Sequence, residues 1–124
     1  MDAAQFNASV FNLVHMIPSQ KVTSCGHIAR LVGAPNQARR VNELVKHLGQ
    51  TSSSAPWHRV ISTSGIIAAH GDLGTIQRSA LEEEGVFVRN GILGESRVEF
   101  RQWGWFPEDV EVLSDSGSDD EWGA

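Results

Sequence analysis

The stretch SAPWHRVI, residues 54–61, places Trp57 between a proline and the pair His58 and Arg59. A histidine beside a central side chain is typical of the surroundings of a reactive group, because imidazole acts as a general base near neutral pH. An indole has no lone pair with the nucleophilicity of a thiolate, but it offers a large flat apolar surface with one N–H donor. These residue types therefore predict binding by contact at Trp57 rather than covalent chemistry.

Cys25 is the only cysteine among the 124 residues. A single cysteine excludes an internal disulfide and a cysteine-based zinc cluster, and it agrees with a reducing compartment. The histidines are His15, His27, His47, His58 and His70. Because their spacing is not that of paired metal ligands, we expect no metal and no cofactor.

Membrane contact is not expected from this sequence. The longest apolar runs are too short to span a bilayer, and the N-terminal MDAAQFNASVF lacks the basic start and apolar run of a secretory signal. We therefore expect an intracellular protein. No basic import signal is evident, but a chain this small can reach nuclear DNA by diffusion, so we expect a nuclear or nucleocytoplasmic location.

The charge of the chain is unevenly distributed. Residues 107–124 hold seven acids and neither lysine nor arginine. Of the 15 acids this leaves eight for residues 1–106, against ten bases, so that part carries about +2 although the whole chain has a net charge of -5. The sequence thus predicts a domain at 1–106 compatible with a polyanionic partner and an acidic tail at 107–124 that we expect to be disordered.

Three helices are predicted in the first half of the chain. The first covers residues 4–17, where apolar side chains recur at helical spacing before Pro18. The second is capped by Thr23 or Ser24 and ends at Gly33, and the third is capped by Asn36 and ends at Gly49. Two short helices joined by a tight turn indicate a helix-turn-helix, whose second helix commonly enters a groove of DNA.

The outward face of that second helix is polar. Its side chains are Gln37, Arg39, Arg40, Asn42, Lys46 and His47. Arginine and lysine suit phosphates, and glutamine and asparagine carry the paired donor and acceptor that base edges require. A solvated polar face without a partner is the alternative interpretation.

The second half predicts smaller elements. Residues 57–62 and 64–68 read as short extended segments that turn at Ser64 and Gly65, and a helix is expected from a Thr75 cap to Gly85. That helix is acidic at its end, which is unfavourable for the helix dipole, so at least one of residues 82–84 should have a specific partner. Residues 86–105 predict one or two strands with turns at 90–91 and Gly94, a plausible wing.

Four motifs converge on one family. They are IPSQKVTSCGHIARLVGAPNQARRV at 17–41, PWHRVI at 56–61, SGIIAAHGDLG at 64–74 and LEEEGV at 81–86. In order and spacing they resemble the DNA-binding domain of the O6-alkylguanine-DNA alkyltransferases, over about residues 6–100. Those enzymes carry an acceptor cysteine where this chain has Trp57, so the chain is most similar to the alkyltransferase-like proteins, the non-catalytic branch. The resemblance implies a mainly α fold, a winged helix-turn-helix DNA-binding domain with a small β wing.

The resemblance also implies roles for individual residues. In the enzymes, the histidine and glutamate matching His58 and Glu84 belong to a relay that activates the thiol, so here they and Arg59 would remain as hydrogen-bonding scaffold. The expected lesion pocket consists of Pro56, Trp57, Val60, His70 and Gly71. His70 stands where relatives place an aromatic or arginine side chain over the extruded base.

On the DNA-binding side, the resemblance assigns Arg39 to the space that the extruded base vacates. Arg40 is the alternative for that insertion and is otherwise expected to meet phosphate or solvent, while Gln37 is expected to contact DNA. Two positions depart from the family. Cys25 replaces a tyrosine that presses on the DNA backbone, and Asn42 replaces a glycine on the recognition helix. For Cys25 we expect packing or a close approach to phosphate.

The resemblance implies a monomeric, non-enzymatic protein that binds double-stranded DNA containing O6-alkylguanine. The protein would flip the damaged nucleotide out of the stack and mark it for nucleotide excision repair proteins. One alternative is a sequence-specific winged-helix regulator, which would discriminate among unmodified duplexes without needing Trp57. The other is a self-alkylating enzyme that uses Cys25 as its nucleophile.

Overall fold

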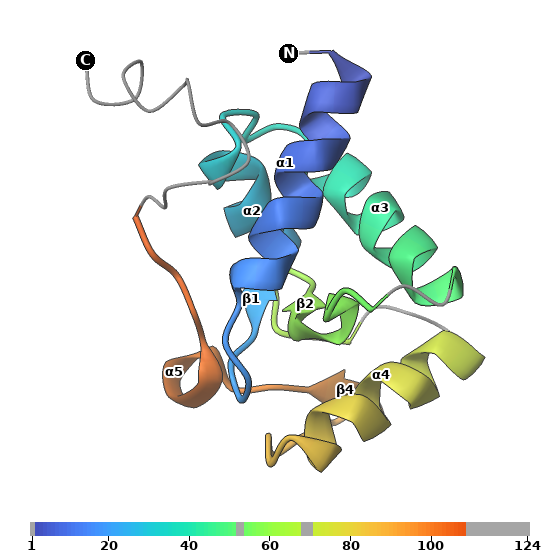
Figure 1. Cartoon of the computed structure of the whole chain (residues 1–124). Coiled ribbons are helices and arrows are strands. Elements are labelled where there is room, and N and C mark those ends of the chain that lie inside the picture. Colours follow the sequence, from blue (N-terminus) through green and yellow to red (C-terminus); the bar gives the residue numbers. More distant parts are fainter. Residues whose placement is uncertain (1, 52–53, 68–70, 109–124) are drawn as a thin grey trace.

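The computed structural model describes residues 2–51, 54–67 and 71–108 (Figure 1). His70 and residues 109–124, most of the acidic tail, lie outside these ranges. Within them the chain is mainly helical, with short strands between the helices. The elements are α1 (Ala3–Met16), β1 (Thr23–Ser24), α2 (Cys25–Leu31), α3 (Ala38–Gln50), the 3-10 helix η1 (Trp57–Arg59), β2 (Val60–Ile61), α4 (Asp72–Glu83), β3 (Arg89–Asn90), β4 (Ser96–Arg97) and α5 (Phe100–Trp103).

Helix α1 lies across α2 and α3 (Figure 1). Its apolar side chains cover one side of the apolar cluster that these three helices share. It begins where the Asp2 carboxylate accepts a hydrogen bond from the Gln5 N–H at 2.8 Å, which satisfies one of the free amides of the first turn. It ends at Met16, as the Pro18 signal predicted. Its buried side chains are Phe6, Val10, Leu13 and Val14.

Helices α2 and α3 form the predicted helix-turn-helix. Ser24 caps α2 by accepting a hydrogen bond from the His27 N–H at 3.1 Å, and Gly33 ends the helix in a left-handed conformation, with a φ of 86°. The prediction that Asn36 caps α3 was wrong. The N-cap of α3 is Gln37, without a side-chain cap bond, because the backbone closes the turn itself: the Gln37 N–H donates to the Ala34 carbonyl at 2.9 Å.

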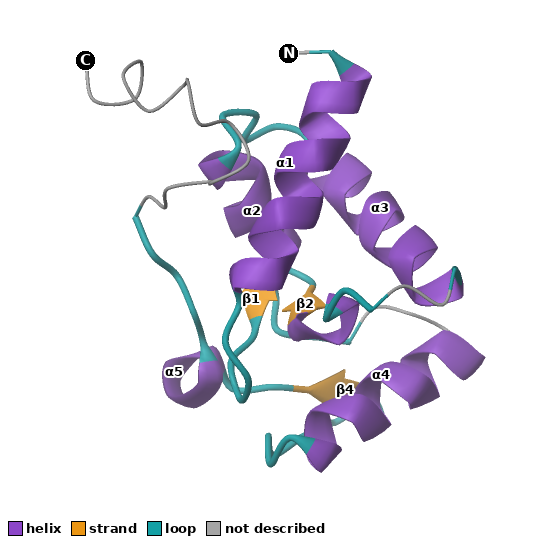
Figure 2. Ribbon diagram, viewed as in Figure 1, coloured by secondary structure: helices purple, strands orange, loops and turns teal. Residues whose placement is uncertain are grey.

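A short parallel pair joins the helical part to the rest of the domain. β1 pairs with β2 in the register Thr23 to Val60 and Ser24 to Ile61, and Figure 2 shows the two strands between the helix-turn-helix and α4. One apolar cluster fills the space under α1, α2 and α3. A second one lies under α4 and the C-terminal segments. The pair β1–β2 therefore fixes the Trp57 segment against both clusters.

The second half differs in part from the prediction. Helix α4 begins at Asp72 rather than after a Thr75 cap, because Gly71 adopts a φ of 64° and lets the chain turn four residues earlier. Its end near Gly85 agrees with the prediction. β3 and β4 pair antiparallel within the segment expected to form strands, but residues 100–103 of that segment form helix α5. A DNA contact by this hairpin stays a prediction.

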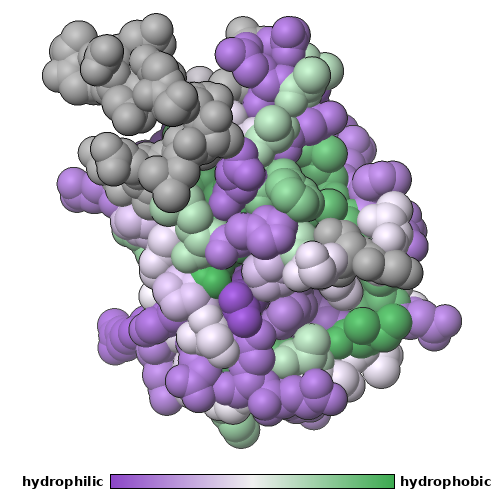
Figure 3. Space-filling model, in the orientation of Figure 1, coloured by the Kyte–Doolittle hydropathy of each residue, from purple (hydrophilic) through white to green (hydrophobic). Residues whose placement is uncertain are grey.

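The surface is mostly hydrophilic on the face drawn in Figure 3, and apolar side chains gather where α1 meets α3. There a groove of about 330 Å³ is lined mainly by apolar side chains. Among the described residues, no helix is long and apolar enough to cross a membrane. The same described ranges contain no group of three or more His, Cys, Asp or Glu residues arranged to hold a metal ion.

Candidate nucleic-acid interface

Trp57 opens the turn η1 rather than an extended segment, which corrects the prediction for residues 57–59. The Trp57 N–H donates to the Ala55 carbonyl at 2.8 Å, and the Arg59 N–H donates to the Pro56 carbonyl at 3.1 Å. These local bonds wind the chain into one 3-10 turn before it enters β2. Trp57 is half-buried there and packs against the core under α3.

The Trp57 indole lies directly against the backbone of α3 at Gly49. A Cβ atom at Gly49 would lie 3.0 Å from Cε2, 3.1 Å from Cδ2 and 3.2 Å from Cε3 of the ring. The prediction that Gly49 ends the helix was wrong, since α3 continues through Gln50. The glycine is a place of close approach instead, and sequence reasoning missed it because a glycine near a helix end is also the usual stop signal.

Glu84 gathers the polar groups behind Trp57. Its Oε2 lies 2.7 Å from His58 Nε2, and it accepts a hydrogen bond from Arg59 Nη2 at 2.6 Å. Arg59 also donates from Nη1 to the Ile17 carbonyl at 2.8 Å. The expectation that one of the acids at the end of α4 has a specific partner is therefore confirmed. The scaffold residues His58, Arg59 and Glu84 form one connected network.

The network keeps Glu84 ionised. Burial by itself would raise the pKa of this carboxyl group, but the hydrogen bonds from Arg59 and His58 outweigh it and lower the pKa from 4.5 to about 2. The side chain of Glu84 is only 16% exposed. The paired charges thus tie η1 to the end of α4 in a partly dry environment.

Gln77 is a supporting residue that sequence reasoning missed. Its side chain is buried, and Nε2 donates to the Val60 carbonyl at 2.9 Å and to the His58 carbonyl at 3.2 Å. The amide of α4 thereby holds the chain on both sides of Arg59. A signal was present, because Gln77 stands one helical turn before the buried Leu81 and so occupies the inner face of α4.

The two arginines at the start of α3 have different surroundings. Arg39 is exposed, and no ion pair or hydrogen bond to its side chain is found among the described residues. The Arg40 guanidinium lies over the Phe6 ring, 4.4 Å from its centroid, a cation–π geometry that fixes it to α1. The structure thus leaves the Arg39 side chain exposed, and its assignment to the duplex in preference to Arg40 stays a prediction. Gln37 is half-buried at the cap.

Cys25 packs in the core beneath the recognition helix. It is 5% exposed, and its Sγ lies 3.7 Å from Oδ1 of the half-buried Asn42. Burial raises the pKa of the Cys25 thiol from 9.0 to about 11. Thiol nucleophiles react as thiolates, so this environment opposes the self-alkylating alternative. It agrees with the packing role expected for Cys25.

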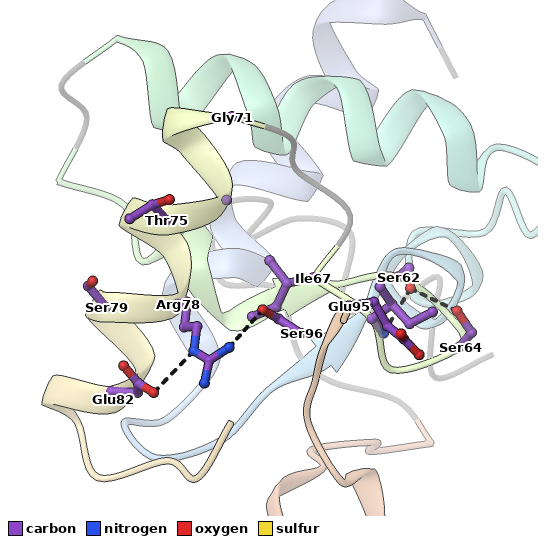
Figure 4. Close-up of a pocket in the computed structure, with 12 residues that line it drawn as sticks. Ser62, Ser64, Ile67, Gly71, Thr75, Arg78, Ser79, Glu82, Glu95 and Ser96 are labelled. Atoms are coloured by element: carbon purple, nitrogen blue, oxygen red, sulfur yellow. Dashed lines mark hydrogen bonds and ion pairs between the residues drawn. The ribbon is translucent and has the colours of Figure 1, made fainter. Parts of the chain in front are cut away.

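The remaining pocket residues lie around η1 and the start of α4. Pro56 is half-buried, Gly71 is exposed, and the Val60 side chain is in the core at 2% exposure. A cleft of about 720 Å³ runs between α4 and the segment from Ser62 to Ile67 (Figure 4). Gly71 lines it but Trp57 does not. Of the predicted pocket residues that the structure describes, the cleft thus contains Gly71 alone. Arg78 within it is paired with Glu82.

The fold and this site are those of a known family of DNA-binding domains. Residues 5–86 match the family described as 6-O-methylguanine DNA methyltransferase, DNA binding domain. The Trp57 region and the helix-turn-helix both fall within the matched residues.

Two similar proteins indicate which branch of this family the chain belongs to. The chain is 39% identical over 106 residues to alkyltransferase-like protein 1 of Schizosaccharomyces pombe, covering 83% of this chain and 96% of that protein. It is 36% identical over 100 residues to the DNA base-flipping protein of Escherichia coli, covering 81% and 74%. The chain belongs to the alkyltransferase-like family.

A solved structure agrees with this assignment. The S. pombe alkyltransferase-like protein in complex with damaged DNA containing O6-carboxymethylguanine has a TM-score of 0.80 to this chain, at 38% identity. The match covers 86% of this chain and all of the other. The expected fold class, a mainly helical DNA-binding domain, is thereby confirmed.

Proposed function

We propose that this protein recognises O6-alkylguanine in double-stranded DNA by flipping the damaged nucleotide and holding it without chemistry. Two observations on relatives support this: one is named a DNA base-flipping protein, and another was solved with DNA containing O6-carboxymethylguanine. A lesion that pairs poorly costs less to extrude than an intact base, by a few kcal/mol at most, and this difference is one source of selectivity.

The placement of Trp57 carries the proposal. The indole stands at the position where the resemblance puts an acceptor cysteine, and one of its faces rests on α3. Its remaining surface is an apolar wall with a single N–H donor, which suits a flat purine. In this proposal Pro56 and Gly71 complete the binding site and Arg39 fills the space left in the duplex. His70, which the resemblance assigns to the same pocket, lies outside the described residues.

The lack of alkyl transfer follows from the available nucleophiles. An indole carbon or nitrogen does not displace an alkyl group from oxygen under these conditions. His58 and Glu84, which would activate a thiol in an enzyme, are 2.7 Å apart and bonded to each other. They hold the turn that carries Trp57, and with Arg59 they serve as scaffold.

A bound but unreactive protein can only shield the lesion or signal its position. We propose that it marks the site for nucleotide excision repair proteins in the nucleus. The acidic residues beyond 107 are either a docking segment for such a partner or a solubilising end. Neither shielding the lesion nor signalling its position needs a chemical reaction by this chain.

Titration of two matched duplexes tests the proposal. They differ only by one O6-methylguanine, and intact-mass measurement follows each titration. We expect tighter binding to the modified duplex and an unchanged protein mass. A mass gain of one methyl group would favour the self-alkylating enzyme. Equal affinity for both duplexes, combined with a strong preference among unmodified sequences, would favour the winged-helix regulator instead.

A further inference from the structure

We propose that Gly49 is a positioning residue that sets how large an alkyl group the Trp57 pocket accepts. This inference rests on the proposed function, because it concerns the same pocket. Gly49 is in the next-to-last position of α3, at the opposite end of that helix from Arg39. The helix that carries the DNA-inserting arginine would therefore also carry the seat of the lesion-contacting indole.

The contact is made with the face of the ring. Cδ2 is a fusion atom inside the indole, with ring bonds to both Cε2 and Cε3. Gly49 approaches all three atoms at nearly equal distances of 3.0–3.2 Å, counted from the position of a Cβ atom. An approach from the ring edge could not reach Cδ2 in this way, so the glycine lies beneath the plane of the ring. One indole face is consequently covered by α3.

Backbone conformation does not explain a glycine here. The positive-φ glycines among the described residues are Gly33, Gly65, Gly71, Gly85 and Gly94, and Gly49 is not one of them. Inside a helix, glycine is less favourable than alanine because it loses more conformational freedom on folding. The position therefore gives up helix stability, and the close approach of Trp57 is the feature that accounts for it.

A side chain at Gly49 must move the ring. A Cβ at 3.0–3.2 Å from three ring carbons is closer than ordinary van der Waals contact at about 3.5–4.0 Å. The α3 backbone is fixed by its hydrogen bonds and by the buried Val45 and Val41, whereas Trp57 is only half-buried on a short turn. The indole shifts away from α3 by a few tenths of an ångström, toward the space that the lesion would occupy.

This displacement predicts selection by size. A narrower pocket rejects a large O6 substituent before it rejects a small one, because protein interiors do not compress to make room. In the wild type, the bare helix surface at Gly49 lets the indole recede as far as the backbone allows. Glycine at this position thus favours a pocket that is wide enough for bulky adducts.

The test measures Gly49→Ala against three duplexes that carry guanine, O6-methylguanine or O6-carboxymethylguanine. We expect affinity for the carboxymethyl duplex to fall about tenfold more than affinity for the methyl duplex, the scale of a small steric change in a pocket. Affinity for unmodified DNA should stay within about twofold. The thermal midpoint should be equal or higher, because alanine favours the helix. Gln50→Ala, an exposed neighbour on α3, is the control.

A second background separates positioning from a general effect on α3. In Trp57→Leu, adding Gly49→Ala should leave the ratio of the two lesion affinities unchanged, because the ring is no longer there to be displaced. An equal change of that ratio in both backgrounds, or no change in the wild-type background, would overturn the role of Gly49.

The free protein supplies an independent readout. Gly49→Ala should shift the Trp57 indole N–H resonance more than those of the other three tryptophans. If this shift occurs but the wild type shows no preference for alkylated DNA, the proposed function is wrong while the positioning of the indole by Gly49 is supported. If the wild type prefers alkylated DNA but the Trp57 indole N–H resonance does not move in Gly49→Ala, the proposed role of Gly49 in positioning the indole is wrong.

Discussion

Arginines serve different purposes in two regions of this molecule. Around η1, α4 and the β3–β4 hairpin, Arg59, Arg78 and Arg97 each form an ion pair with a glutamate. At the start of α3, Arg40 rests on an aromatic ring, and Arg39 is exposed without a partner among the described residues. The paired arginines hold the turn and the hairpin in place. Arg39 has no such pair within the described ranges, and neither do the exposed Arg30, Arg89 and Arg101.

The comparison separates charges that stabilise the fold from charges that remain available for binding DNA. A half-buried pair with several hydrogen bonds resists separation, because either partner alone would be left desolvated. An exposed cation without a partner costs little in the free protein and gains most when it meets phosphate or enters a duplex. Stability and DNA affinity should therefore respond to different substitutions.

The largest effect on stability is expected from Glu84→Gln. The carboxamide keeps the size of the side chain but leaves the half-buried Arg59 without its counter-charge. We expect the free energy of unfolding to fall by about 3 kcal/mol, measured by urea denaturation. Glu82→Gln is the matched control, since its pair with Arg78 is at the surface and should contribute no more than about 0.5 kcal/mol. Equal losses in both variants would contradict the distinction between the two pairs.

The same network predicts an acid transition. Glu84 has a pKa of about 2 in the folded protein against 4.5 without its partners. Its contribution to stability is therefore fully present above about pH 4.5 and is lost as the pH falls towards 2. The difference in unfolding free energy between wild type and Glu84→Gln should shrink across this window. A difference that stays constant from pH 6 to pH 3 would refute the assignment.

Arg39→Ala should change DNA binding without changing stability. Losing one phosphate or groove contact weakens duplex binding about tenfold and reduces the salt dependence by about one counterion. Fluorescence anisotropy at several salt concentrations measures both quantities.

Arg40→Ala should behave in the opposite way. Loss of its contact with Phe6 lowers the unfolding free energy by about 0.5–1 kcal/mol, with a smaller effect on DNA affinity. If Arg40→Ala weakened binding more than Arg39→Ala, the assignment of the two arginines would have to be exchanged.

Local signals in the sequence predicted much of the fold. The Pro18 stop, the cap at Thr23 or Ser24 and the Gly33 terminator all act through residues within a few positions, so they can be recognised from the chain alone. The same holds for the acids at the end of α4, whose unfavourable position pointed to a partner for Glu84. Four ordered motifs were enough to identify the family.

The failures have a common physical cause. Asn36 and Thr75 are ordinary cap residues, but backbone bonds of the turn and the positive φ of Gly71 started the helices elsewhere. Gly49 was mistaken for a stop because a glycine near a helix end is the usual stop signal, whereas its actual neighbour, Trp57, belongs to another element. Contacts between separate elements leave no periodic signal, and for that reason Gln77 and the Trp57 seat required the structure.

The central claim is that the Trp57 indole reads the alkylated guanine. The most direct measurement is the ratio of affinities for matched duplexes with and without O6-methylguanine, in wild type and in Trp57→Ala. The account predicts a ratio well above one for the wild type and close to one for the variant, while binding to unmodified DNA is largely kept. A Trp57→Ala protein that still preferred the alkylated duplex as strongly as the wild type would contradict it.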